Sequence, residues 1–239
     1  MGNAVSHGPR YAIFYVPPAG SELFRFGSAV LGYDCYLGQA VARPTELSRE
    51  PDRWEKLTAE PRRYGFHATL KAPFYLKSAC SETQLVSALN SFAGLGHAVP
   101  SFTPKLEMLS GFAALVPEAV STDLNALAAN CATIFDAFRA PMTAEERARR
   151  LASGLNHGQI QNLDRWGYPY LFSDFRFHMT LTGKVAVDQR DEVLGVLQRA
   201  FRPIGRGTSF PIEGISLVRQ DSAAHSFRVI DHATLRSGL

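Results

Sequence analysis

Two similar stretches of this 239-residue sequence decide its fold: FHATLKAPFYL at residues 66–76 and FHMTLTGKVAV at residues 177–187. Both are typical of strands, because polar and apolar side chains alternate with a period of two. Each is followed by an amphipathic helix and then by two strands that can form a hairpin. The order strand, helix, hairpin therefore occurs twice, which predicts an internal duplication. We expect the first copy to span residues 64–117 and the second to span residues 175–235.

The elements outside the two copies are predicted from the same periodicities. RYAIFYVP at residues 10–17 indicates a strand, and residues 21–32 indicate a short amphipathic helix. A longer helix is expected between the copies, at residues 120–138. Residues 42–63 hold three prolines among many charges and are predicted to be a surface excursion with one helical turn. Residues 141–172 begin as a charged helix and continue as an aromatic loop, so we expect an insertion or lid.

Length and composition fit a single bilobal domain with a substantial core. Hydrophobic residues make up 46% and the net charge is +3, which excludes a disordered chain and a strongly basic nucleic-acid-binding domain. Three widely spaced cysteines argue against a disulfide framework and for a reducing compartment. No apolar run is long enough for a bilayer and no signal peptide is evident, so we expect a cytoplasmic protein with no membrane partner. Met1, Gly2 and Ser6 fit the short myristoylation pattern, but a single myristoyl chain anchors weakly.

The two His-x-Thr triplets carry the chemistry that we expect. A strand sends His67 and Thr69 to one face, and it does the same for His178 and Thr180. If a pseudo-twofold axis relates the copies, the two faces meet across a central cleft. Hydrolysis of a phosphodiester requires a base for the attacking water and an acid for the departing oxygen, and a pair of imidazoles supplies both near neutral pH. Threonine hydroxyls and a charged imidazole stabilise the phosphate oxygens without a metal.

The residues do not say which histidine is the base and which is the acid. Two histidines with no acidic partner at ligand spacing make a poor zinc site, so we expect neither a metal nor another cofactor. Two limbs near neutrality are expected in the pH dependence of the rate. No Gly-rich phosphate loop and no serine-hydrolase elbow is convincing in this sequence.

The motifs HATL at residues 67–70 and HMTL at residues 178–181 resemble those of the two-histidine (2H) phosphoesterase superfamily. The resemblance implies an α+β fold, a duplicated bilobal arrangement of two antiparallel sheets flanked by helices around a central cleft. It also implies metal-independent hydrolysis, or sometimes ligation, of cyclic nucleotide or RNA-end phosphodiesters. RYAIFYVPP, YGFHATLKAPF and FRFHMTLTG further resemble a bacterial branch linked to phosphonate metabolism and found with carbon–phosphorus lyase genes. That branch implies a small cyclic phosphate, such as a ribosyl cyclic phosphate, rather than RNA.

Further residues are predicted to bind the substrate because strand geometry places them near the motifs or near one end of a strand. A cation on the histidine face would hold phosphate, although a solvated surface charge fits the same pattern. The predicted residues are Lys71, Arg176, Thr182, Tyr11, Tyr15 and Arg219. The expected partner is a small phosphorylated substrate. An RNA-end 2′,3′-cyclic phosphodiesterase or ligase and a non-catalytic sensor of a phosphorylated ligand are the alternatives, and the oligomeric state stays open.

Overall fold

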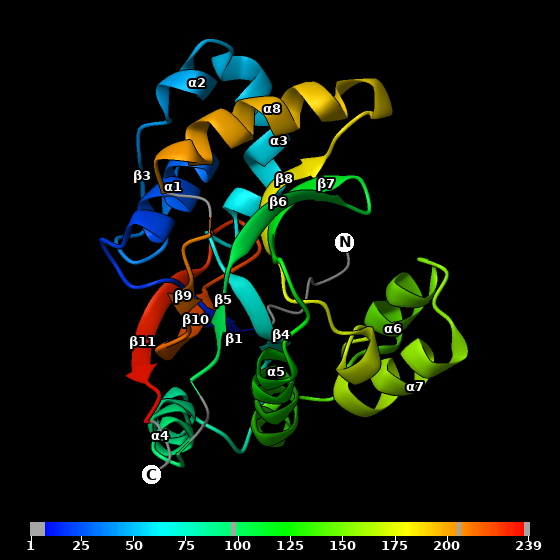
Figure 1. Ribbon diagram of the computed structural model, residues 1–239. Coiled ribbons are helices and arrows are strands. Elements are labelled where there is room, and N and C mark those ends of the chain that lie inside the picture. The colour runs from blue at the N-terminus through cyan, green and yellow to red at the C-terminus, as the bar shows by residue number, and fades with distance from the viewer. Residues whose placement is uncertain (1–7, 97–98, 205–206, 237–239) are drawn as a thin grey trace.

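The computed structural model describes residues 8–96, 99–204 and 207–236, and it is built around one seven-stranded antiparallel sheet. The order of its strands is β11-β10-β1-β4-β8-β7-β6 (Figure 1). The bounds are Arg10–Tyr15 (β1), Ala68–Tyr75 (β4), Pro104–Leu109 (β6), Phe112–Pro117 (β7), Met179–Lys184 (β8), Gly214–Gln220 (β10) and Arg228–Thr234 (β11). Two short ribbons pair separately: Tyr33–Asp34 (β2) with Gln39–Ala40 (β3), and Ser101–Phe102 (β5) with Phe210–Pro211 (β9). A mixed fold with antiparallel strands is therefore confirmed.

The helices gather at the two ends of the sheet and on one side of it. Their bounds are Glu22–Leu31 (α1), Thr45–Ser48 (α2), Pro51–Arg62 (α3), Glu82–Ala93 (α4), Thr122–Ile134 (α5), Ala144–Leu151 (α6), His157–Trp166 (α7) and Arg190–Phe201 (α8). In Figure 1, α4 and α5 lie at one end, α1, α2, α3 and α8 lie at the other, and α6 and α7 project to the side. Short 3-10 turns at Phe135–Phe138 (η1), Phe172–Asp174 (η2), Val187–Gln189 (η3) and Arg202–Ile204 (η4) follow or precede them.

Local sequence signals explain most of these elements. The Ser21 hydroxyl caps α1, and Ser81 forms a capping box with Gln84 at the start of α4. The hairpin β6–β7 turns at Ser110 and Gly111, which have φ angles of 50° and 94°. Positive φ at both central residues is the geometry of a tight hairpin turn that suits the twist of the strands. The predicted strands, helices and hairpin are thus confirmed at these positions.

The two halves of the sheet meet at a single hydrogen-bonded pair. β4 and β8 pair only through Ala68 and Met179. The hairpin β6–β7 lies beside β8, whereas β10 lies beside β1, which in turn pairs with β4. The hairpin β6–β7 of the first predicted copy therefore pairs with the His-x-Thr strand of the second, whereas the hairpin β10–β11 is separated from β4 by β1. The expectation of two antiparallel sheets is wrong for these seven strands, because the pairing of β4 with β8 joins them into one sheet.

Residues 42–63 are not a surface excursion. They form α2 and α3, and Trp54 of α3 is 1% exposed because the helix packs against β8. Pro51 occupies the first turn of α3, where a missing backbone N–H costs nothing, and Pro61 lies in its last turn. Pro51 and Pro61 therefore lie near the two ends of a helix and do not indicate a loop, so the prediction for residues 42–63 is wrong.

The two faces of the sheet differ in how they are covered. One face carries the large hydrophobic core, in which α5 packs on β4, α4 on β10 and α3 on β8. The other face carries a small cluster around Phe14, Cys35 and Phe227. Because β1 lies inside the sheet, its odd-numbered side chains enter the large core and its even-numbered ones enter the small cluster.

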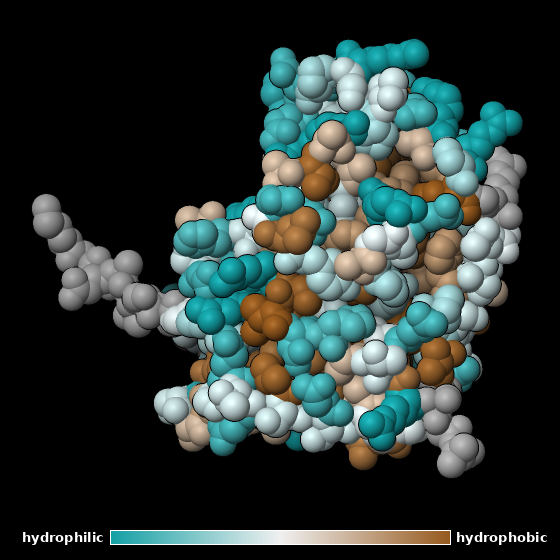
Figure 2. All heavy atoms as spheres, turned by 90° about the vertical axis from the view of Figure 1, so that its left-hand side faces the viewer, coloured by the Kyte–Doolittle hydropathy of each residue, from teal (hydrophilic) through white to brown (hydrophobic). Residues whose placement is uncertain are grey.

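The outer surface beside β11 is mixed in character. Figure 2 shows apolar residues there in small groups separated by hydrophilic ones. The edge strand β11 carries Arg228, Asp231 and His232, and charges on an edge discourage pairing with another chain. Among the described residues, no helix combines the length and hydrophobicity that crossing a membrane requires. The myristoylation pattern at residues 1–6 lies outside the described residues.

Candidate functional site

The structure brings the two His-x-Thr triplets together at the junction of β4 and β8. Ala68 and Met179, the paired residues, are the middle residues of the triplets. In an antiparallel ladder the next positions set His67 beside Thr180 and Thr69 beside His178. His67, His178 and Thr180 line one cavity of about 310 Å³, which we call the histidine chamber.

Each histidine is held by a backbone carbonyl two residues before it. Nδ1 of His67 lies 2.9 Å from the carbonyl oxygen of Gly65, and Nδ1 of His178 lies 2.7 Å from that of Arg176. Because a carbonyl only accepts, both rings carry their proton on Nδ1 in this arrangement, which leaves an Nε2 lone pair on each. Gly65 has φ of 73°, and an added Cβ would lie 2.6 Å from Cβ of Cys35. Only glycine therefore presents this carbonyl to His67 without strain.

The surroundings of both rings favour the neutral imidazole. His67 stacks on Phe14 with ring centroids 3.8 Å apart, and its Nε2 accepts a hydrogen bond from the Thr69 hydroxyl at 3.1 Å. Burial lowers the pKa of His67 to about 4, although the carbonyl of Gly65 opposes this shift. Burial also lowers the pKa of His178, and the carbonyl of Arg176 opposes it. Both imidazoles are consequently neutral in the free protein at neutral pH.

One cation of the histidine chamber was missed by the sequence analysis. Lys184, at the end of β8, is exposed and lines the chamber with Glu60, Tyr64 and Phe112. Lys184 lies an even number of residues after His178, so the period of the strand is a signal that could have found it. Glu60 and Tyr64 come from the end of α3 and the loop after it, which sequence periodicity does not relate to β8.

A second cavity, of about 480 Å³, adjoins the histidine chamber, and both are lined by Phe112 and His178. We call it the aromatic chamber. Tyr168 and Tyr170 of the 141–172 segment form one wall, with ring centroids 5.7 Å apart. Thr69, Gln159, Asp174 and Arg176 also line this cavity. The segment predicted as an insertion or lid thus borders the site directly.

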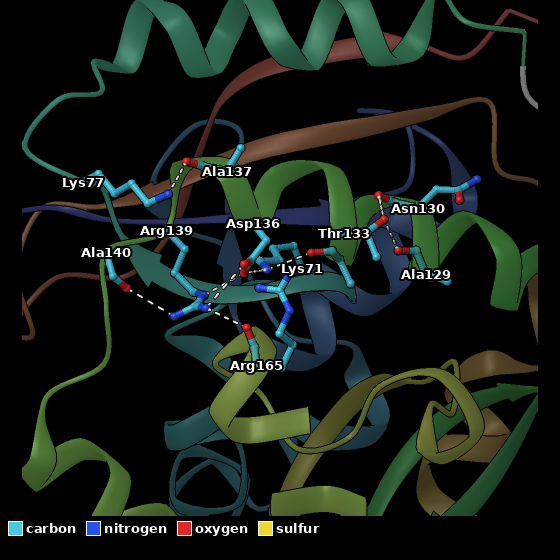
Figure 3. Close-up of polar contacts among 11 residues, drawn as sticks. Lys71, Lys77, Ala129, Asn130, Thr133, Asp136, Ala137, Arg139, Ala140 and Arg165 are labelled. Atoms are coloured by element: carbon cyan, nitrogen blue, oxygen red, sulfur yellow. Dashed lines mark hydrogen bonds and ion pairs between the residues drawn. The ribbon is translucent and has the colours of Figure 1, made fainter. Parts of the chain in front are cut away.

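A buried ion cluster attaches this wall to β4 (Figure 3). Lys71 of β4 donates to the Asp136 carboxylate at 2.8 Å, and Arg139 donates to the same oxygen at 2.7 Å. Arg139 also donates to the carbonyl of Arg165 at 3.2 Å, near the end of α7. Gly167, with φ of 75°, allows this approach because an added Cβ would lie 2.9 Å from Cδ of Arg139. The strand that carries Thr69 and the wall are therefore connected through polar contacts.

Lys71 does not lie on the histidine face as expected. Phe14 pairs with Thr69 but Ile13 pairs with Lys71, so β4 contains one extra residue at this point. Such a bulge shifts the alternation by one residue and turns Lys71 to the face covered by α5. There Lys71 is 3% exposed, and its ammonium also donates to the carbonyl of Ala132. It is a buried structural cation.

Thr182 lines the histidine chamber but its hydroxyl is occupied. It is fully buried, accepts a hydrogen bond from the amide of Ala113 and donates one to the carbonyl of Gly183, both at 2.9 Å. The register between β7 and β8 shifts here, so the hydroxyl replaces a backbone acceptor in the ladder. Thr180 keeps its place on the chamber.

Tyr11, Tyr15 and Arg219 lie away from the histidines. Tyr15 pairs with Ala68 and is buried in the large core, on the opposite face from His67. Tyr11 donates to Glu82 at 2.8 Å, and Arg219 forms ion pairs with Glu82 and Asp221. The expectation that these three residues bind the substrate beside the histidines is wrong, because odd-numbered residues of β1 and their neighbours on β10 face the large core. Of the six predicted binding residues, Arg176 lines the aromatic chamber and Thr182 lines the histidine chamber.

Within the described parts of the chain, no group of three or more histidine, cysteine, aspartate or glutamate side chains is arranged to hold a metal ion. The three cysteines are free thiols, and burial raises the pKa of Cys35 to about 12 and that of Cys131 still further. The polar groups that line the two chambers are imidazoles, hydroxyls, the Lys184 ammonium and the Arg176 guanidinium, together with the carboxylates of Glu60 and Asp174. The two cations are the groups that suit an anionic ligand.

Comparison with known proteins shows a family match and two similar curated proteins. Residues 69–228 match the family described as "Protein of unknown function (DUF1045)". Two curated relatives are each named ribose 1,5-bisphosphate phosphokinase PhnN. The one from Janthinobacterium sp. (strain Marseille) is 33% identical over 89% of this chain and 48% of its own length. The one from Laribacter hongkongensis (strain HLHK9) is 35% identical over 92% of this chain and 50% of its own length. The chain spans about half the length of these relatives.

Solved structures are more distant. One titled as a phosphoesterase is 13% identical, with a TM-score of 0.41 over 96% of this chain and 99% of its own. A conserved protein of unknown function from Agrobacterium tumefaciens is 12% identical, with a TM-score of 0.42 over 93% and 85% of the two chains. TM-scores below 0.5 do not define a shared fold. The match to the DUF1045 family, in contrast, covers more than half of the sequence. The chain therefore belongs to the DUF1045 family.

Proposed function

We propose that this chain is a metal-independent phosphoesterase of the two-histidine type that opens a small cyclic phosphodiester. The observation that carries the proposal is the pair of imidazoles on one chamber, each with Nδ1 on a carbonyl and an unprotonated Nε2, which in His67 accepts a hydrogen bond from the Thr69 hydroxyl. Thr180 and Lys184 border the same chamber and supply a hydroxyl and a positive charge for phosphate oxygens.

The proposal includes a duplicated fold. β4, α4 and the hairpin β6–β7 have the same order as β8, α8 and the hairpin β10–β11. Both His-x-Thr strands also have a register shift after the threonine, and both histidines are held by the carbonyl two residues earlier. These repeated details support two copies related by a pseudo-twofold axis near the pair Ala68 and Met179.

In the proposed reaction, water attacks phosphorus as Nε2 of one histidine takes its proton. The bond from phosphorus to one ring oxygen breaks, and that oxygen receives a proton from Nε2 of the other histidine. One water is consumed, and the cyclic diester becomes a monoester and a hydroxyl. We assign the base to His67, because its low pKa keeps the ring neutral. His178 is then the general acid and carries on Nε2 the proton that the departing oxygen receives. The negative charge of the bound phosphate raises the pKa of His178 and so favours this protonated form.

The names of the relatives point to a ribosyl phosphate as substrate. They act by name on ribose 1,5-bisphosphate, and this chain matches only half of each. A kinase loop of the form G-x-x-x-x-G-K-S/T is absent from the sequence, since Gly183-Lys184 is followed by Val185. Opening a 1,2-cyclic phosphate of ribose 5-phosphate at the 2-oxygen yields ribose 1,5-bisphosphate. We propose that cyclic compound as the substrate.

The test is hydrolysis of ribose 5-phosphate 1,2-cyclic phosphate, followed by phosphorus NMR in the presence of EDTA. His67→Ala and His178→Ala should each lower kcat by about 10²-fold or more. His157→Ala is the matched control, because His157 is exposed and its ring contacts the Gln161 side chain, away from both chambers. Full activity in either chamber variant would refute the mechanism, and loss of wild-type activity in EDTA would indicate a metal enzyme.

The alternatives give different results in parallel assays. Hydrolysis of RNA with a 2′,3′-cyclic end, with binding that weakens steeply with salt, would favour an RNA enzyme. Thermal stabilisation by the cyclic phosphate without turnover would favour a sensor.

A further inference from the structure

We infer that Arg176 forms a second phosphate subsite, in the aromatic chamber that it lines together with His178. The substrate class is then a sugar that carries two phosphate groups, one cyclic and one terminal. This inference rests on the proposed function and specifies what the reacting sugar must carry.

Arg176 lies close to His178 in the chain. Arg176 precedes His178 by two residues, so their Cα atoms are at most about 7 Å apart. His178 lines both the histidine chamber and the aromatic chamber, whereas Arg176 lines the aromatic chamber and a neighbouring cavity of about 400 Å³. A ligand in the aromatic chamber can therefore contact both His178 and Arg176.

The guanidinium of Arg176 is not neutralised within the described part of the protein. Arg176 is exposed and forms no ion pair there, although Asp174 lines the same chamber. The Asp174 carboxylate instead accepts a hydrogen bond from Gln159 at 3.2 Å. Arg139 shows the contrast, since its guanidinium is bound to Asp136. A free guanidinium beside a cavity is suited to two parallel hydrogen bonds to phosphate.

The aromatic chamber, which His178 and Arg176 both line, is suited to a sugar ring. Tyr168 and Tyr170 offer aromatic surface, and Gln159 and Asp174 offer polar atoms to ring hydroxyls. The carbonyl of Arg176, not its side chain, holds Nδ1 of His178. A change of the side chain can therefore remove the subsite while the backbone contact to the histidine remains.

The kinetic test compares two substrates, ribose 5-phosphate 1,2-cyclic phosphate and ribose 1,2-cyclic phosphate. Arg176→Gln should lower kcat/KM for the first at least about tenfold more than for the second, mainly through KM, because a charge-assisted hydrogen bond is lost. Arg176→Lys should recover part of that difference. Arg199→Gln, which removes an exposed arginine from α8, should change neither value. Equal losses on both substrates would overturn the inference.

A binding test separates this inference from the proposed reaction. Calorimetry would compare ribose 1-phosphate with ribose 1,5-bisphosphate, which differ only in the terminal phosphate, on the wild type and on Arg176→Gln. Wild type should prefer the bisphosphate by about tenfold or more, and the variant should lose most of that preference. This result without turnover would refute the phosphoesterase and retain the subsite. Turnover with no preference in wild type, or with the same preference in the variant, would refute the subsite and retain the phosphoesterase.

Discussion

Replacement of Asp136 by asparagine should destabilise the protein strongly. Asp136 is the one acid of the cluster that it forms with Lys71 and Arg139, and the three side chains are 12%, 3% and 15% exposed. Asp136→Asn leaves two buried cations without a counter-charge, which costs about 3 to 5 kcal/mol of the free energy of unfolding. Lys71→Met leaves Asp136 paired with Arg139 and removes a hydrogen bond to a carbonyl, so about 1 to 3 kcal/mol is expected.

The measurement is urea denaturation of both variants at neutral pH, with the free energy of unfolding extrapolated to water. The double variant should be more stable than Asp136→Asn alone, because removal of Lys71 also removes one of the unpaired cations. Equal stability of Asp136→Asn and the wild type, or a greater loss in Lys71→Met than in Asp136→Asn, would refute the reasoning.

The cluster also predicts how stability depends on pH. Burial would raise the pKa of Asp136, but its hydrogen bonds to Arg139 and Lys71 outweigh this and lower it. A carboxyl group with a lowered pKa in the folded state contributes stability above its unfolded pKa and loses it as pH falls through the folded value. The wild type should therefore lose more stability than Asp136→Asn between neutral and strongly acidic pH, which the same denaturation series would measure.

Two further predictions concern the histidine chamber. The pKa values of His67 and His178 are both lowered. Both limbs of the pH profile of kcat/KM should therefore lie below pH 6.5 and not near neutrality. Limbs at or above pH 6.5 would contradict the lowered pKa values. Gly65→Ala should lower both stability and kcat, because the new Cβ meets Cys35 and displaces the carbonyl that binds His67. The control is Gly38→Ala, at φ of 69° with open space around it, which should cost only backbone strain. Similar kcat values for the two variants would count against this role of Gly65.

Much of the local structure could be predicted from sequence patterns. The alternation in residues 10–17 predicted β1, and Ser81 with the stripe after it predicted α4. The two His-x-Thr triplets were found because strand periodicity depends only on neighbouring residues. The pairing of the triplets across the junction of β4 and β8 has no such local signal.

The errors in the predicted site arise where a strand departs from regular geometry or where distant segments meet. The bulge between Thr69 and Lys71 turns Lys71 to the opposite face of the sheet from the histidines. The period-two pattern of FHATLKAPFYL did not predict this bulge. The aromatic chamber depends on the contact of Arg139 with Arg165, which lie 26 residues apart in sequence. The wall formed by Tyr168 and Tyr170 could therefore not be assigned to the site from sequence alone.

Sequence patterns identified most of the strands and helices, although not α2 and α3, and they placed His67 and His178 on strand faces shared with threonines. These properties follow from periodicity and capping within a few residues. The folded chain was needed to show that β4 and β8 join one sheet, that Lys71 is buried against Asp136, and that Lys184 and Arg176 border the two chambers. The physical reason is that register, bulges and packing between distant segments are set by the complete sheet and its helices, and a cavity exists only where they fail to fill the space.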